Sequence, residues 1–169
     1  MPVLVVVGGL PGSGKSTVAE ALAHRRRMPF LRVDRIEQAV VDQTRLTHPV
    51  GPVGHAVAHL LAAEQLALGL DVVVECVNPL GVTREGWNGT AAAAGARILQ
   101  VELVCSDAAE HRRRVETRAT DVAGLVKPTW AEVVGRAYEP WPEPHLVLDS
   151  SVCSVASMVD AVAVAVEDR

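Results

Sequence analysis

The stretch Gly9-Leu10-Pro11-Gly12-Ser13-Gly14-Lys15-Ser16, followed by Thr17, is a complete Walker A pattern: a glycine, four residues, then Gly-Lys-Ser. It follows the apolar run Val3-Leu4-Val5-Val6-Val7, which is typical of a buried strand. The residues after it, 17–23, have the pattern of a helix. A glycine-rich turn between a strand and a helix N-terminus directs backbone N–H groups and the helix dipole at an anion. The stretch therefore predicts a phosphate-binding loop.

The loop carries the side chains that a nucleoside triphosphate requires. We expect Lys15 to reach the β- and γ-phosphates and the Ser16 hydroxyl to bind Mg²⁺. Lysine occurs at only one other position, Lys127, so a lysine in this motif is not explained by a need for solubility. ATP and Mg²⁺ are therefore the expected cofactors, with all residues from Gly9 to Thr17 contacting the nucleotide.

Strand and helix patterns alternate along the rest of the chain, which indicates an α/β fold with helices on both faces of a parallel sheet. We expect a single three-layer domain over residues 1–169 with a five-stranded parallel sheet. A segment with little periodicity, at about 119–128, is expected to form a loop that closes as a lid. The expected strands are 3–7, 30–33, 71–75, 98–105 and 145–148, and the expected helices are 15–27, 35–43, 53–68, 83–94, 107–118, 130–138 and 154–166.

Composition limits the partners of the chain. With a net charge of −4 and no basic stripe, the sequence disfavours nucleic acid and acidic membranes as partners. The three cysteines have no metal-site spacing and fit a reducing compartment, and no apolar run approaches a membrane span. We therefore expect a cytoplasmic protein, monomeric or homodimeric, whose partners are ATP and a small acceptor.

Two acidic residues follow predicted strands and are candidates for chemistry. Asp34 follows the second strand, where it is expected to cap the next helix, to serve an acceptor hydroxyl as general base, or both. Glu75 ends the apolar run Val72-Val73-Val74, a Walker B context in which an acid holds Mg²⁺ directly or through water. Asn78, three residues later, is a candidate for positioning either the acceptor or the loop.

Basic residues gather in the helix before the aperiodic loop. Arg114 and Arg118 are four residues apart, so they are expected to share a face of that helix. Their position next to the loop favours a role at the phosphates over a solvated face, in which the arginines would only pair with Glu110 and Glu116. His55 and His59 are also four apart, but without a third ligand they are expected on a helix surface or an acceptor-pocket wall.

The order of these features resembles the small P-loop kinases of the AAA-type predicted kinase group. This group neighbours chloramphenicol phosphotransferase, gluconate kinase, zeta toxin, the polynucleotide 5′-kinases and adenylate kinase. The resemblance covers essentially the whole chain and implies an adenylate-kinase-like P-loop NTPase fold. It also implies that Asp34 orients or activates the acceptor, that Glu75-Cys76-Val77-Asn78 matches an acid-x-x-Asn pattern, and that one of Arg114 and Arg118 stacks on adenine while the other stabilises the transferring phosphoryl group.

The chain departs from these kinases beside Asp34. An arginine that grips the acceptor often stands two or three residues later, but here Arg35 follows at once and Glu37 takes the usual position. The carboxylate pair disfavours a highly anionic acceptor, and only Arg35 and Arg45 lie between strands two and three to hold a nucleoside monophosphate.

The sequence thus predicts an ATP-dependent kinase acting on a small-molecule hydroxyl or a nucleotide. Its expected catalytic residues are Lys15, Asp34, Arg114 and Arg118, its metal-binding residues Ser16 and Glu75, and Arg118 is expected to contact the nucleotide. The alternatives are a nucleotide-binding switch, a vestigial ATP-binding protein, and a nucleic-acid 5′-end kinase.

Overall fold

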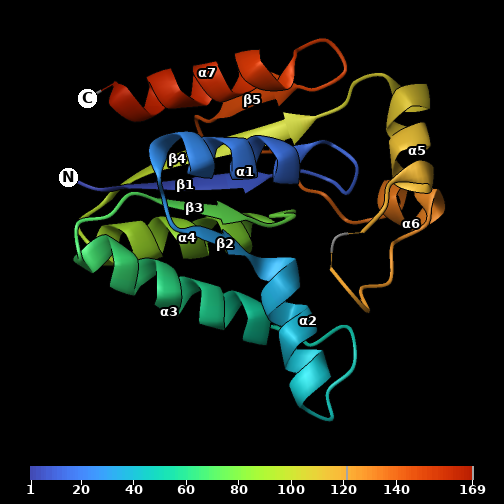
Figure 1. The fold of residues 1–169 in the computed structure, drawn as a ribbon, viewed down its shortest axis with the longest axis horizontal. Helices are drawn as coiled ribbons and strands as arrows, with labels where there is room; N and C mark the ends of the chain where they lie inside the picture. The colour runs from blue at the N-terminus through green and yellow to red at the C-terminus, as the bar shows by residue number, and fades with distance from the viewer. Residues whose placement is uncertain (121, 169) are drawn as a thin grey trace.

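The computed structural model describes residues 1–120 and 122–168. Its five strands form one parallel sheet in the order β2-β3-β1-β4-β5 (Figure 1). The expected α/β class and parallel five-stranded sheet are confirmed. The strands are β1 (Val3–Gly8), β2 (Phe30–Arg32), β3 (Val72–Glu75), β4 (Arg97–Val104) and β5 (Leu146–Asp149). The helices are α1 (Lys15–Arg26), α2 (Val33–Gln43), α3 (Val53–Ala67), α4 (Gly81–Ala93), α5 (Ala108–Thr117), α6 (Trp130–Val134) and α7 (Val155–Glu167).

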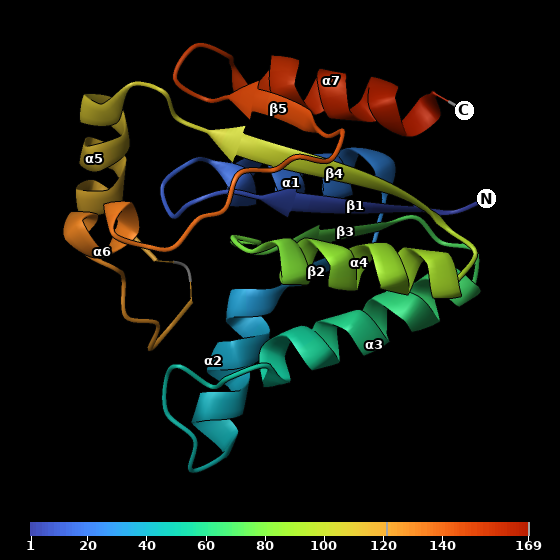
Figure 2. The ribbon, with the colours of Figure 1, turned by 180° about the vertical axis from the view of Figure 1, so that it is seen from behind.

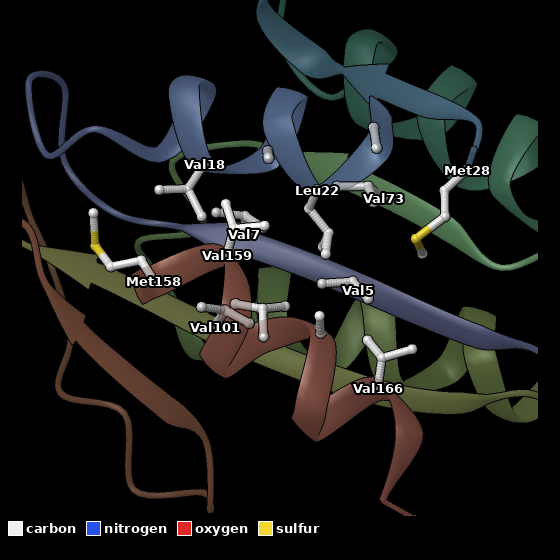
Figure 3. Close-up of a cluster of buried hydrophobic side chains, with 14 of the residues drawn as sticks. Val5, Val7, Val18, Leu22, Met28, Val73, Val101, Met158, Val159 and Val166 are labelled. Atoms are coloured by element: carbon white, nitrogen blue, oxygen red, sulfur yellow. The ribbon is translucent and has the colours of Figure 1, made fainter. Parts of the chain in front are cut away.

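The central strands β1 and β3 are buried on both faces, which explains their apolar runs. In β1 every residue is buried, and successive side chains point to opposite faces. Val5 and Val7 pack with α1 and α7, as Figure 3 shows, whereas Leu4 and Val6 pack with α3 and α4. Helices therefore cover both faces of the central strands, as seen from behind in Figure 2.

Parallel strands place all their carboxyl ends at one edge of the sheet, where ligands bind in open α/β folds. The loop after β1, the start of α2 after β2, and Glu75 at the end of β3 all lie at this edge. The register pairs Val7 with Glu75 and Arg32 with Glu75. The fold thus gathers the phosphate-binding stretch and both candidate acids from three different parts of the chain.

Two helix boundaries differ from expectation for identifiable reasons. The helix expected over 130–138 ends at Val134, and Tyr138 instead donates its hydroxyl hydrogen bond to Glu102 of β4 at 2.8 Å. The helix expected from residue 83 begins at Gly81, because its first N–H donates to the Glu139 carboxylate at 2.6 Å. Both differences depend on contacts between distant parts of the chain, which local patterns do not contain.

The segment after α6 closes the face of the sheet near β1 and β4. Trp141 lies so close to Gly8 that a Cβ at that glycine would come within 2.9 Å of the indole ring. Arg84 of α4 is buried beneath this segment, donates to the Pro140 carbonyl at 2.9 Å, and places its guanidinium 5.0 Å from the centre of the Trp141 ring. Within the described residues, none of the helices is long and apolar enough to cross a membrane.

Candidate active site

The loop between β1 and α1 has the backbone geometry of a phosphate cradle. Gly9, Gly12 and Gly14 have φ values of 143°, 85° and 92°, a region that side chains disfavour. At Gly9 a Cβ would also overlap the Leu103 carbonyl oxygen, so glycine is required for packing as well as for conformation. Gly14 is the N-cap residue of α1 and has no side chain to accept a capping hydrogen bond. The first N–H groups of α1 are therefore available to an anion.

The phosphate loop is also held from outside, by α5. His111 is 8% exposed, and its Nε2 donates to the Pro11 carbonyl at 2.8 Å. A Cβ at Gly12 would come within 2.7 Å of Val115 Cγ2, so α5 lies directly against the loop. On its other side the His111 ring meets Trp130 edge-on, with centroids 5.2 Å apart. No sequence signal singles out His111, because it stands in a helix whose obvious feature is its run of arginines.

We expect His111→Phe to weaken ATP binding about tenfold, because the ring packing is kept but the Pro11 carbonyl loses its donor, at a cost of roughly 1–3 kcal/mol. His111→Gln, whose amide can still donate, should recover most of the affinity. Calorimetric titration with a non-hydrolysable ATP analogue measures both, and His24→Phe on the exposed face of α1 is the control. Equal affinities for His111→Phe and the unmodified protein would show that the bond does not shape the loop.

Four side chains of alternating charge, Lys15, Glu75, Arg32 and Asp34, run from the phosphate loop to α2. Lys15 Nζ lies 3.6 Å from Glu75 Oε1, and both side chains are buried. Arg32 donates from Nε to Glu75 Oε2 at 3.1 Å and from Nη2 to Asp34 Oδ2 at 3.0 Å. We call these four residues the charge chain. Each charge in the charge chain has a neighbour of opposite sign. The contact with Glu75 therefore keeps the Lys15 ammonium at the loop, and the contact with Arg32 orients the Asp34 carboxylate.

Asp34 does not cap a helix, so that part of the prediction was wrong. Strand β2 ends at Arg32, which is the N-cap residue of α2, and Asp34 is the second residue of the helix. Val33 is 3% exposed and packs in the core. Asp34 Oδ1 accepts the Arg35 N–H at 2.8 Å, and its side chain is 34% exposed. A carboxylate in the first turn interacts favourably with the helix dipole, and Asp34 also lines the cleft that contains the phosphate loop.

Asn78 lies in the loop after β3 and is fully buried, with a φ of 53°. Its amide donates to Gln100 Oε1 at 3.3 Å, and Gln100 in turn donates to Asn88 Oδ1 at 2.8 Å. The neighbouring Val77 carbonyl accepts the Gly9 N–H at 3.1 Å. Of the two roles considered for Asn78, this geometry suits positioning of the loop that touches the phosphate cradle.

The arginines of α5 divide into two groups. Arg112 and Arg113 are exposed and pair with Glu116 and Glu110. Arg114 points inward: Nη1 and Nη2 donate to the Ser150 hydroxyl and carbonyl at 2.8 and 3.0 Å. Ser150 is itself beside Gly14, where a Cβ would come within 3.5 Å of the serine Cβ.

Arg118 is the C-cap residue of α5 rather than part of it, because the helix ends at Thr117. Its carbonyl accepts a hydrogen bond from Lys127 Nζ at 2.6 Å. The Arg118 N–H still donates to the Arg114 carbonyl at 3.0 Å, and both residues line the cleft described below.

A cleft of about 1180 Å³ joins these parts. Its nucleotide side is formed by the phosphate loop, Glu75, Arg114 and Arg118, and its opposite side by α2, the segment 48–51 and the start of α3. The expected lid segment borders the cleft: a Cβ at Gly124 would come within 3.0 Å of Gln38 Nε2 on α2. Residue 121 of this segment lies outside the described residues. The cleft is also lined by Asp34, Glu37, His48, His55, Thr83 and Arg136.

The predicted metal ligands are only partly brought together. Ser16 and Glu75 both line the cleft, but Glu75 already contacts Lys15 and Arg32. Within residues 1–120 and 122–168, no group of three or more His, Cys, Asp or Glu side chains is arranged to hold a metal ion. In Mg²⁺ sites of nucleotide-binding proteins, phosphate oxygens and water supply most of the ligands.

The parallel sheet, the glycine cradle at the N-terminus of α1 and the cleft define a P-loop NTPase fold of the small-kinase type. The chain belongs to the AAA domain family, whose model matches residues 4–137. Comparison with curated proteins gives no match.

Solved structures with this fold include several kinases. A proposed kinase of Chloroflexus aurantiacus superposes with a TM-score of 0.78 at 22% identity, covering 96% of this chain and 97% of its own. The gluconokinase of Sinorhizobium meliloti gives 0.65 at 21% identity, covering 98% and 92%. The APS kinase CysC of Mycobacterium tuberculosis, solved with AMPPNP and APS, gives 0.69 at 20% identity, covering 99% and 98%. These similarities confirm the kinase-like P-loop fold.

Proposed function

We propose that this protein is an ATP-dependent kinase that transfers the γ-phosphoryl group to a hydroxyl of a small acceptor in the cytoplasm. The observation that carries the proposal is the charge chain, which connects a phosphate cradle to a carboxylate on the opposite wall of one cleft. A protein that only binds nucleotide needs the cradle but has no need of a carboxylate aimed at the space beyond it. The related kinase structures support the same reading.

The nucleotide side of the site fits ATP with Mg²⁺. Three glycines leave room for phosphate oxygens at the start of α1, where the N-cap residue has no side chain that could accept a hydrogen bond from the helix. Lys15 supplies a buried positive charge. Ser16 would hold Mg²⁺ together with phosphate oxygens, and Glu75 would act on it through water, since its carboxylate is occupied by Lys15 and Arg32. When bound, the ion would neutralise charge on the β- and γ-phosphates.

The protein's own residues would do the rest by positioning and charge. Asp34 accepts the proton of the attacking hydroxyl, held in orientation by Arg32. Lys15 stabilises negative charge on the transferring group. Arg114, fixed by Ser150 beside the loop, contacts the nucleotide, and Arg118 brings a second charge when the lid segment closes.

The direct test is transfer of labelled γ-phosphate from ATP in the presence of a metabolite extract. Formation of a labelled small molecule by the protein, absent with Lys15→Met, supports a kinase. ADP and inorganic phosphate as the sole products, at a rate unaffected by any extract, would favour the alternative of a nucleotide-binding switch. Label on oligonucleotide 5′ ends would favour the nucleic-acid kinase.

Replacing Arg118 with alanine should lower kcat by on the order of tenfold or more while changing ATP affinity little, because its charge is needed most in the transition state.

We also expect hydrogen exchange across 119–128 to slow when an ATP analogue and acceptor are both bound, since closure buries the segment. Arg112→Ala, on the exposed face of α5, is the matched control. Normal activity of Arg118→Ala, with equal exchange in both states, would leave the segment as an ordinary connector.

A further inference from the structure

The wall of the cleft that faces the phosphate loop is built from hydrogen-bond acceptors. Asp34 and Glu37 are three residues apart on α2, and both line the cleft. Residues at this spacing lie on one helix face, with about 5–6 Å between their Cβ atoms. The Glu37 side chain lies against the start of α3, where a Cβ at Gly54 would overlap Glu37 Cγ. Glycine at this position therefore leaves the space that Glu37 occupies.

Glu37 has no donor within the described part of the chain: it is half-buried and accepts no hydrogen bond from residues 1–120 or 122–168. Burial raises the pKa of its carboxyl; His48 and Arg136 act to lower this pKa, and Asp34 acts to raise it. A carboxylate taken out of water without a donor is costly, so a ligand that donates to Glu37 would relieve this cost. Asp34, by contrast, already accepts from Arg32.

His55 adds a third acceptor. It lines the cleft from the first turns of α3, and burial lowers the pKa of its ring, which favours the neutral imidazole. A neutral imidazole offers one nitrogen as acceptor. Of the cations that line the cleft near α2, Arg136 is exposed and Arg32 is engaged by Glu75 and Asp34, and Lys127 donates to the Arg118 carbonyl. The side chains of α2 and α3 that line the cleft are mainly hydrogen-bond acceptors.

We infer that the acceptor is an amino sugar or amino cyclitol, a donor-rich molecule whose protonated amine binds Glu37 while a hydroxyl lies at Asp34. The inference rests on the proposed kinase activity. Two carboxylates three residues apart on one helix face can bind an amine and a hydroxyl of the same small molecule. The same two carboxylates disfavour highly anionic acceptors, such as phosphate monoesters and sugar acids.

The reaction on such an acceptor balances without a further reactant. The hydroxyl oxygen forms a bond to the γ-phosphorus as the bond from that phosphorus to the bridging oxygen of ATP breaks. The hydroxyl proton passes to the Asp34 carboxylate and then to water, and ADP leaves with the electron pair of the broken bond. The amine stays protonated throughout and serves only recognition.

The experiment separates a metabolite extract at pH 7 into cation-exchange-bound, anion-exchange-bound and unbound fractions, and measures labelled product from γ-labelled ATP with each. We expect the acceptor in the cation-exchange-bound fraction. With that fraction, Glu37→Gln should lower kcat/KM about 10- to 100-fold, with ATP affinity unchanged. Glu64→Gln, on the exposed face of α3, is the matched control and should behave as the unmodified protein.

Three other outcomes of this experiment would overturn the inference, and one of them would also overturn the kinase proposal. Product formed only with the anion-exchange-bound or unbound fraction would overturn the inference and leave the kinase proposal standing. An acceptor in the cation-exchange-bound fraction whose kcat/KM is unaffected by Glu37→Gln would also overturn it, because its amine would then bind elsewhere. Transfer with no fraction at all would overturn the kinase proposal and this inference together.

Discussion

Lys15→Met should reduce phosphoryl transfer by on the order of 10²–10³-fold or more, the loss expected when a preorganised charge at the transition state is removed. Lys15 is the one lysine at the phosphate cradle, and its ammonium is held there by Glu75 at 3.6 Å. Methionine keeps the length of the side chain in its buried position but supplies neither charge nor donor. ATP affinity by calorimetry and turnover with labelled ATP measure the effect.

The fold should survive this substitution. Glu75 keeps its second cation, Arg32, whose Nε donates to it at 3.1 Å, so the buried carboxylate is not left alone. A small loss in melting temperature is expected, together with a native circular dichroism spectrum. Arg112→Met, which removes an exposed cation of α5 outside the cleft, serves as the control and should keep full activity. A folded Lys15→Met protein that binds and turns over ATP normally would refute the assignment of the phosphate site.

The phosphate loop could be predicted because its signal is local. The glycines, the lysine and the flanking strand and helix are contiguous, and the three positive φ angles occur at glycines that the motif contains. The sheet could be predicted for a related reason. A strand buried on both faces is mostly apolar, as β1 and Val72–Val74 of β3 are, and this pattern cannot be mistaken for a surface helix.

Contacts between distant segments could not be predicted. Arg32 meets Glu75 because β2 and β3 are neighbours in a register that no local pattern encodes. His111 meets Pro11, a hundred residues away, because α5 packs on the loop. Arg84 is buried under the segment around Pro140, 56 residues further along the chain, which no local pattern around it indicates. In each case the residue type fits several environments, and only the tertiary structure selects one.

Asp34→Asn should slow phosphoryl transfer by roughly 10²-fold or more while leaving ATP affinity near normal, as expected for loss of a general base. The amide keeps the shape of the side chain but cannot accept the proton of the acceptor hydroxyl. Arg32, which now donates to Asp34 at 3.0 Å, would keep its bond to Glu75, so the nucleotide side of the charge chain should persist. Single-turnover transfer with saturating ATP isolates the chemical step from binding.

A purely structural role for Asp34 makes a different prediction. A carboxylate in the first turn of α2 stabilises that helix by about 0.3–1 kcal/mol through the dipole, and asparagine would lose this contribution. In that case the melting temperature would fall while the single-turnover rate stayed the same. Asp42→Asn is the control for a structural effect on α2. Asp42 lies on the same helix and accepts a hydrogen bond from Gln38, but it is not among the residues that line the cleft. Only a large loss of rate in Asp34→Asn, absent from Asp42→Asn, identifies Asp34 as the group that serves the nucleophile.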